Sequence, residues 1–571
     1  MVYTTTATAL ALAALSPAPN FVPLVALLAT MRLTAFTFLP RPSGYIYAVV
    51  QAGFIAVAAA AMHLAPSMDA LSTPNLSLIV ISMITFAMSG FSSAVVFAAA
   101  YAVRSTHTMW AQLTLFPALW ASAWGSMSSV SPVGQLVTWS PVVGLGPYSW
   151  LRSILGQWAI DWVTAAWAVV FSEVAGAWLV GTPEEVDDSA IDRQPLLVDY
   201  EGNNYQSVQA AQNGSQANGS TATRMSTRNR GLLSLTAILV LLAAPSYTYP
   251  HLPLPINSGD TTPLSVACIM PPRKAGKSLT FDDYFKESSR WVSMATTAVL
   301  VWPEGSVSFS SEVERDQSFD YIVKHLGGQE FLKSKYVGVG FEEVVPPVAN
   351  GPASKRNGFA LIDTGSGVVQ LSYYKRNLVP IAESFSMVPG HNTPDVFTLQ
   401  MPAPSKNWKP NDWASTPNHT RPIPITTSIC LDFAHSSSFT SLDSRPAVIL
   451  APAKTWHVAV GNAMWEQAKA RATETGSTVF WCDGGEGALG GIATSGYSEI
   501  VQRGWGSWSK VIPLAYPFDT RRTVFTLGGQ STAFAIVWLV TGVGYGPTLG
   551  RFAVQGSMQL ARRLTRGSSA N

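Results

Sequence analysis

Long runs of apolar residues, broken by Pro, Gly or Arg, fill residues 1–181 and predict a polytopic α-helical membrane domain. The pattern predicts six helices, at about 4–15, 21–31, 44–65, 76–103, 108–126 and 150–181. The first two are short for a hydrocarbon core that normally takes about 20 residues, so they form either two thin spans or one re-entrant hairpin. Two later apolar runs, at 231–247 and 527–546, bring the expected total to about eight spans.

Two polar segments separate or follow the apolar runs. Residues 182–230 are rich in Asn, Gln, Ser and Thr, and they contain too few apolar residues to offset the entropy of ordering. They therefore predict a disordered loop. Residues 547–571 carry several arginines and predict a basic tail.

The distribution of Lys and Arg predicts the topology, because these residues concentrate on the cytosolic side of short loops. Placing the N-terminus inside puts the polar loop and the basic tail in the cytosol. The segment 260–520 is then expected on the lumenal, periplasmic or extracellular side. With this topology the sequons at Asn75 and Asn418 are accessible to glycosylation, whereas those at Asn213 and Asn218 are not.

Residues 260–520 have an ordinary composition, in which short β-rich runs alternate with helical ones. Runs rich in Val, Ile, Phe and Tyr predict strands at 263–270, 297–302, 336–341, 358–363, 368–374, 426–433, 447–451 and 478–482. Helices are predicted at 281–296, 315–332 and 459–475. The alternation predicts helices layered on a mixed sheet in one α/β domain.

The composition narrows the class of protein further. Of 571 residues, 47% are hydrophobic and only 12% are charged, about half of the usual ~25%. This excludes a disordered chain and a coiled coil, and the net charge of +2 offers no basic face for nucleic acid. Cys268, Cys430 and Cys482 are too few for a disulfide scaffold and match no zinc pair. The eight His residues form no metal-binding pair, so neither a metal nor another cofactor is expected.

Three predicted strand ends carry reactive side chains. Glu304 follows an apolar strand and a proline, Lys375 follows two tyrosines, and Cys430 lies near the end of a strand. A strand end can hold a group toward a pocket on a fixed backbone, and a thiol beside a base or a cation can act as a nucleophile. Each residue alone also has a structural interpretation, as a turn residue, a snorkelling lysine and a small buried apolar group.

Taken in this order, Glu304, Lys375 and Cys430 resemble the triad of the nitrilase (carbon–nitrogen hydrolase) superfamily. Residues 9–24 and 116–120, and the layout of helices, outward domain and final span, resemble its membrane branch, the apolipoprotein N-acyltransferases. The resemblance implies a nitrilase-like αββα sandwich at 260–520. The long polar loop and the clustered sequons favour a eukaryotic, fungal member.

The resemblance also implies roles for individual residues. Glu304 takes the proton of Cys430, the thiolate attacks an ester or amide carbonyl, and Lys375 stabilises the resulting oxyanion. An amine, or water in a hydrolase, then accepts the acyl group from the Cys430 thioester. Supporting roles are implied for five further residues, namely Glu383, Leu431, Asp432, Trp456 and Glu474.

The leading functional hypothesis is a membrane N-acyltransferase that uses a phospholipid as acyl donor, because the donor's chain can stay in the apolar layer. Its acceptor is a lipid-modified protein or another amine. A membrane-bound amidase of the same superfamily and a non-catalytic membrane scaffold are the alternatives. The family has Tyr-Glu where this chain has Leu431-Asp432, which leaves the acceptor open. A monomer is expected.

Overall fold

The computed structural model describes residues 2–543, except 16–17, 42, 69, 71–72, 107, 137, 141, 181–226, 249–251, 257, 274–277, 295–296, 328–334, 347–353, 404–412 and 415–418. Nearly all of the predicted loop at 182–230 and the whole predicted tail at 547–571 lie outside the described residues. The sequons at Asn213, Asn218 and Asn418 lie outside them as well.

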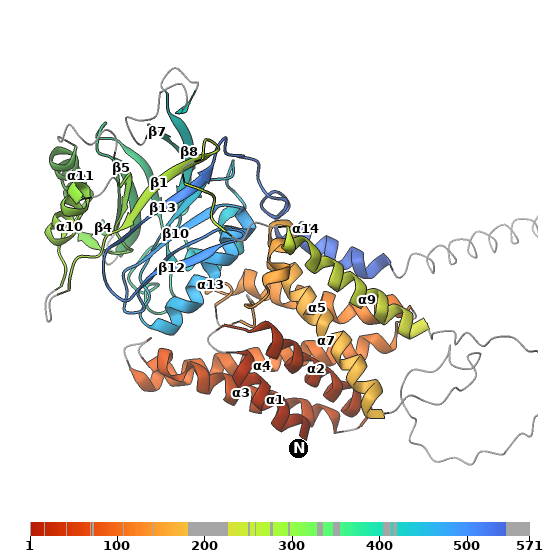
Figure 1. The fold of residues 1–571 in the computed structure, drawn as a ribbon. Helices are drawn as coiled ribbons and strands as arrows, with labels where there is room; N and C mark the ends of the chain where they lie inside the picture. The colour runs from red at the N-terminus through yellow and green to blue at the C-terminus, as the bar shows by residue number, and fades with distance from the viewer. Residues whose placement is uncertain are drawn as a thin grey trace, which may run out of the picture.

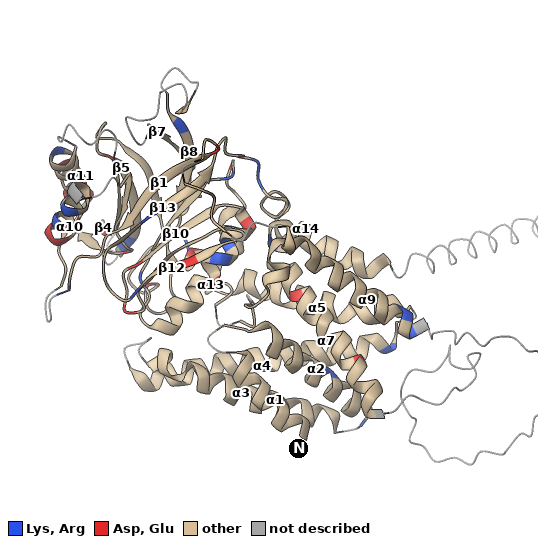
Figure 2. Cartoon of the chain, in the orientation of Figure 1, with Lys and Arg blue, Asp and Glu red and all other residues tan. Residues whose placement is uncertain are grey.

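Apolar helices form one part of the molecule (Figure 1). They are α1 (Val2–Ala14), α2 (Phe21–Phe38), α3 (Gly44–Met68), α4 (Pro74–Arg104), α5 (Met109–Val130), α7 (Gln157–Val180), α9 (Thr227–Ala243) and α14 (Val524–Gly542). Charged residues are sparse on these helices and frequent in the other part of the molecule (Figure 2).

Six of the described helices are long and apolar enough to cross a membrane, which indicates a membrane protein. They are α2, α3, α4, α7, α9 and α14. Of the other two predicted spans, α1 has only 13 residues, and α5 contains Pro117 and two buried tryptophans. The count of eight spans therefore stays a prediction.

The predicted helix at 150–181 is not continuous. A short 3-10 helix, η1 (Gly146–Leu151), and α6 (Arg152–Leu155) precede α7. Gly156 ends α6 with a φ of +61°, a conformation that favours glycine. Its Cα also approaches the ring of Phe525, so a Cβ there would lie 2.4 Å from a ring carbon. The glycine lets α14 pack closely against this turn.

The α/β domain contains two sheets. The first has the order β13-β1-β2-β4-β5-β6, with β3 paired to β4, and the second has the order β12-β11-β10-β9-β8-β7. The strands of the first are β1 (Thr261–Cys268), β2 (Val299–Val301), β3 (Val307–Phe309), β4 (Tyr336–Val345), β5 (Ser354–Asp363), β6 (Val369–Tyr374) and β13 (Trp508–Ala515). Those of the second are β7 (Phe397–Met401), β8 (Arg421–Thr427), β9 (Val448–Ala453), β10 (Thr478–Asp483), β11 (Leu489–Ala493) and β12 (Ser498–Arg503).

Helices cover the outer faces of the two sheets (Figure 1). The outer face of the first sheet packs against α10 (Phe281–Met294) and α11 (Glu312–Leu326) in an apolar core that includes Phe319 and Val337. The inner faces meet in a second core, where Phe359 and Phe480 are fully buried. On the far side, α13 (Val458–Thr475) lies between the second sheet and the membrane helices. The prediction of apolar helices followed by an α/β domain is confirmed.

One strand prediction fails at a residue that matters. The strand predicted at 426–433 is β8, which ends at Thr427, and Cys430 begins a 3-10 helix, η3 (Cys430–Ala434). The Oδ2 atom of Asp432 accepts a hydrogen bond from the backbone N–H of Ile429 at 3.2 Å. This bond caps a helical turn that the backbone N–H of Asp432 closes by donating to the carbonyl of Ile429 at 3.0 Å, so the apolar run leaves the sheet before the cysteine.

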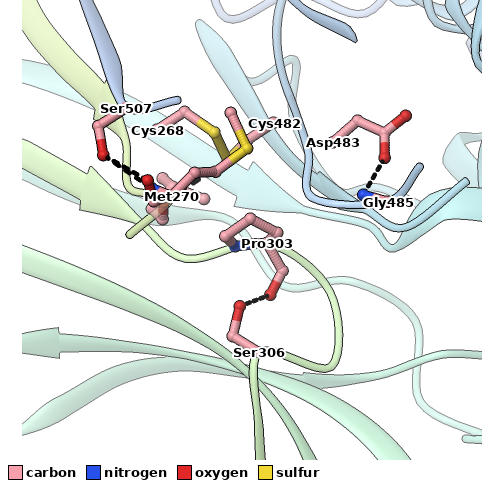
Figure 3. The surroundings of a disulfide bond; sticks show 9 residues. Cys268, Met270, Pro303, Ser306, Cys482, Asp483, Gly485 and Ser507 are labelled. Carbon is pink, nitrogen blue, oxygen red and sulfur yellow. Dashed lines mark hydrogen bonds between the residues drawn. A yellow bond between two sulfur atoms is a disulfide. The ribbon is translucent and has the colours of Figure 1, made fainter. Parts of the chain in front are cut away.

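A disulfide joins the two sheets (Figure 3). Cys268 ends β1 and Cys482 lies in β10, with 5.5 Å between their Cα atoms. Both residues are fully buried. The sequence excluded a disulfide scaffold but did not predict this single bond, because 214 residues separate the two cysteines.

Candidate functional site

Glu304 lies in the turn after β2, where the chain leaves the first sheet. The strand is fully buried, and the indole N–H of Trp302 donates to Ser288 at 2.8 Å, which anchors the turn. The Oε1 atom of Glu304 accepts hydrogen bonds from Asn357 and Lys375, both at 2.7 Å. Its Oε2 atom is buried and has no hydrogen-bond partner among the described residues. One carboxylate oxygen is thus held and the other is free.

Lys375 directly follows β6 and connects two carboxylates. Its Nζ donates to Glu304, and to both oxygens of Glu383 at 2.7 and 2.8 Å. The side chain is only 1% exposed. Glu383 is itself held by the backbone N–H of Val379, at 2.7 Å. Three hydrogen bonds therefore fix the ammonium in one position, as the three donors of a lysine allow.

Cys430 is the free cysteine and the first residue of η3. Its φ of +41° is rare for a residue with a side chain. Such a conformation persists only where the surroundings enforce it, and it is common at functional sites. The thiol lies beside Glu304, and this interaction favours the charged carboxylate.

Asp432 connects the segment that carries Cys430 to the segment that carries Lys375. Its Oδ1 accepts from the backbone and side-chain N–H groups of Asn377, at 2.9 and 2.7 Å, and its Oδ2 accepts from Tyr373 at 2.7 Å. Asp432 is fully buried, and Leu431 beside it is 4% exposed. The carboxylate holds η3 against the end of β6, so it positions the triad.

Burial and charge set the protonation states of the triad. Burial and the Glu304 carboxylate raise the pKa of the Cys430 thiol, which Lys375 and the backbone N–H of Lys454 oppose. Burial also raises the pKa of Glu304, against the effect of Lys375. Burial alone would lower the pKa of Lys375, but the neighbouring acidic groups raise it. The resting site therefore holds a protonated thiol beside an ammonium.

The segment that carries Cys430 rests on the helical part. The backbone N–H of Gln135, in the connection between α5 and η1, donates to the carbonyl of Ala434 at 2.9 Å. Gln530 of α14 donates to Ser436 at 2.9 Å. The cysteine is therefore only a few residues from direct contacts with membrane helices.

Two of the expected supporting residues contact the helical part instead of the triad. The indole N–H of Trp456 donates to the carbonyl of Pro66 in α3 at 3.1 Å. Glu474 pairs with Arg471 of the same helix at 2.8 Å and lies near Arg152 of α6. Both residues therefore join the α/β domain to the membrane helices.

Two further groups at the site were not predicted from the sequence. Asn357 in β5 binds Glu304, but a single polar residue in a strand carries no recognisable signal. The backbone N–H of Lys454 contacts the thiol, and backbone contacts are independent of residue type. The described residues contain no cluster of His, Cys, Asp and Glu suited to a metal.

The arrangement suits nucleophilic acyl chemistry. The thiol can act as a nucleophile, the free oxygen of Glu304 can take its proton, and the ammonium of Lys375 can stabilise an oxyanion. Buried hydrogen bonds hold Glu304 and Lys375 in place, and those of Asp432 hold the segment that carries Cys430.

No protein-family model matches the chain, and no curated protein matches it in sequence. Among solved structures, it is similar to an amidase of the nitrilase superfamily from Nesterenkonia AN1, in a mutant form. The identity is 14%, the coverage 48% of this chain and 97% of that one, and the TM-score 0.34.

It is also similar to Nit3 of Saccharomyces cerevisiae, a member of branch 10 of the nitrilase superfamily, at 14% identity. The match covers 45% of this chain and 92% of that one, with a TM-score of 0.32. A glutamine-dependent NAD(+) synthetase from Cytophaga hutchinsonii is 12% identical over 44% and 43% of the two chains, with a TM-score of 0.30. The structures that resemble the α/β domain thus include nitrilase-superfamily enzymes, and at these values the similarity bears on neither substrate nor acceptor.

Proposed function

We propose that the protein is a membrane N-acyltransferase that moves an acyl chain from a phospholipid to an amine through a thioester on Cys430. The observation that carries this proposal is the buried cluster of Glu304, Lys375 and Cys430, in which the segment with Cys430 contacts the apolar helix α14. A soluble amide would not require a site at this junction. A phospholipid can keep its chains in the bilayer while its ester reaches the thiol.

In the first step, Glu304 takes the proton from the Cys430 thiol as the sulfur attacks the ester carbonyl. The negative charge that develops on the carbonyl oxygen is stabilised by Lys375 and by the backbone N–H groups near the sulfur. When the tetrahedral intermediate collapses, the carbon–oxygen bond breaks. Glu304 returns its proton to the leaving alcohol, a lysophospholipid, and the acyl group remains on Cys430.

In the second step, an amine attacks the thioester carbonyl and gives its proton to Glu304. The carbon–sulfur bond breaks, the product is an amide, and Glu304 reprotonates the sulfur of Cys430. Attack by water in place of the amine would release a fatty acid, which is the reaction of an amidase or esterase. Acyl transfer and hydrolysis therefore differ only in this second step.

We also propose that the α/β domain faces the lumenal, periplasmic or extracellular side. The distribution of Lys and Arg supports this side. The bond between Cys268 and Cys482 supports it independently, because disulfides persist in oxidising compartments and are rare in the cytosol.

The test is mass spectrometry of the purified protein after incubation with phospholipids. We expect an acyl adduct on the peptide that contains Cys430, removed by hydroxylamine and absent in Cys430→Ala. Addition of an amine should discharge the adduct into an amide. If fatty acid is released at the same rate with and without the amine, the protein is a hydrolase. Full activity of Cys430→Ala would refute the mechanism. Gel filtration of the variant controls for folding.

A further inference from the structure

Lys454 connects the reacting sulfur to the rim of the site. It follows β9 directly, at the start of the segment that leads to α13. Its backbone N–H contacts the Cys430 sulfur, whereas its side chain is exposed. The Nζ atom lies 3.8 Å from the position that a Cβ on Gly305 would take. The ammonium is therefore beside the residue that follows Glu304.

The other charges near this rim have partners. Glu342 lies near Gly305 as well, but it pairs with Lys355 at 3.1 Å. Arg273 pairs with Glu486 at 2.7 Å and stacks on the ring of Trp505. Among the described residues, no carboxylate lies within ion-pair distance of Lys454. An unpaired cation at the edge of a reactive pocket is free to bind an anion of the substrate.

Lys454 lies close to one end of the apolar helix α3. Trp456, two residues later, donates to the carbonyl of Pro66, near the end of the apolar helix α3. Two residues span at most about 7 Å. The ends of membrane-spanning helices lie in the headgroup region, where a lysine and a phosphate attract each other. In a membrane spanned by α3, the Lys454 ammonium would be near the headgroup phosphates, while the backbone of the same residue contacts the sulfur.

We infer that Lys454 binds the phosphate of the phospholipid donor while the donor's ester lies at Cys430. In a glycerophospholipid only a few bonds of glycerol separate the ester from the phosphate, and the four methylenes of the lysine separate its ammonium from its backbone. This inference rests on the proposed acyl transfer and specifies which part of the donor is recognised. It makes Lys454 a donor-binding residue, selective for lipids that carry a phosphate.

The experiment compares two donors with the same acyl chains, a phosphatidylglycerol and a diacylglycerol, in detergent micelles with the full chain. The rate of Cys430 acylation is followed by intact mass spectrometry at low donor concentration. For Lys454→Gln we expect a loss of about tenfold with the phospholipid, as for a hydrogen bond to a charged group, and no loss with diacylglycerol. Lys454→Glu should lose more, and Lys454→Arg should retain most of the rate. Lys355→Gln, which removes a paired cation of the same rim, is the matched control.

Equal losses with both donors would overturn the inference, since Lys454 would then act on the reaction and not on the phosphate. An unchanged rate with phospholipid would overturn it too. Inorganic phosphate that slows the diacylglycerol reaction of the wild type, but not of Lys454→Gln, would assign the site to a free anion instead. If the wild type forms no adduct with either donor, the proposed function itself fails. If every variant forms the adduct and all variants respond to the two donors in the same way, the proposed function stands and only the phosphate contact of Lys454 is refuted.

Discussion

The contact between Glu383 and Lys375 allows a prediction in which two reactivities of Cys430 change in opposite directions. The perturbation is Glu383→Gln, which keeps the length of the side chain and removes its charge. Glu383 accepts two of the three hydrogen bonds of the Lys375 ammonium, at 2.7 and 2.8 Å. With an amide, one of these oxygens becomes an N–H₂ group that cannot accept.

The magnitude follows from this loss. A hydrogen bond to a charged group contributes about 1.5–3 kcal/mol, and a factor of ten in rate corresponds to about 1.4 kcal/mol. Since Lys375 must be held to stabilise the oxyanion, Cys430 acylation should fall about 10- to 100-fold. Alkylation of the same thiol needs no oxyanion. The Glu383 charge raises the pKa of Cys430, so its removal lowers that pKa and should speed alkylation at neutral pH.

The assay measures both rates on one preparation, with phospholipid for acylation and iodoacetamide between pH 6 and 9 for alkylation. Ser384→Ala is the control, because Ser384 is next in the same loop and its hydroxyl accepts a hydrogen bond from the backbone N–H of Ile381, at 3.0 Å, and not from Lys375. A Glu383→Gln variant that acylates within twofold of the wild type would refute the positioning of Lys375 by Glu383. A parallel fall in both rates would indicate a distorted site.

Three further outcomes are expected. Replacing Cys268 and Cys482 with serine should lower the free energy of unfolding by about 2–5 kcal/mol, measured as a lower thermal midpoint, whereas an unchanged midpoint would mean that the bond does not form. Asn357→Leu removes a donor to the Glu304 carboxylate, so its pKa should rise and the acidic limb of the pH–rate profile should move to higher pH; an unshifted limb would exclude Glu304 as the titrating base. Asn75→Gln should remove a glycosidase-sensitive gel shift in a eukaryotic host, and a wild type with no shift at this sequon would contradict the proposed topology.

The sequence was informative where one element determines the position of a residue. The apolar run before Glu304 and the aromatic run before Lys375 predicted strands, and both strands are present: β2 is fully buried, and β6 is a partly buried strand at the end of the sheet. Hydropathy and periodicity suffice there because β2 is buried on both faces, whereas β6 buries alternate residues. The helices α10, α11 and α13 were also predicted, with errors of a few residues at their ends.

The sequence was uninformative where a tertiary contact decides. The run around Cys430 is apolar enough for a strand, but the bonds of Asp432 to Asn377 and Ile429 fold it into a 3-10 turn. The strands β3, β7, β11, β12 and β13 were not predicted, because they are short, glycine-rich or only partly buried. Glu474 illustrates the same limit, since its contact with Arg471 at the junction depends on how helices pack.

The pairing of β1 with β13 bears on how the chain is synthesised. The two strands run antiparallel over eight residue pairs, from Thr261 opposite Ala515 to Cys268 opposite Trp508. The outer edge of β1, the first strand of the domain, is therefore covered only after β13, its last strand, has been synthesised. Only a few residues then separate β13 from α14, so α14 leaves the ribosome soon after the sheet can close. Insertion of α14 into the membrane and completion of the α/β domain thus fall within the same short interval of translation.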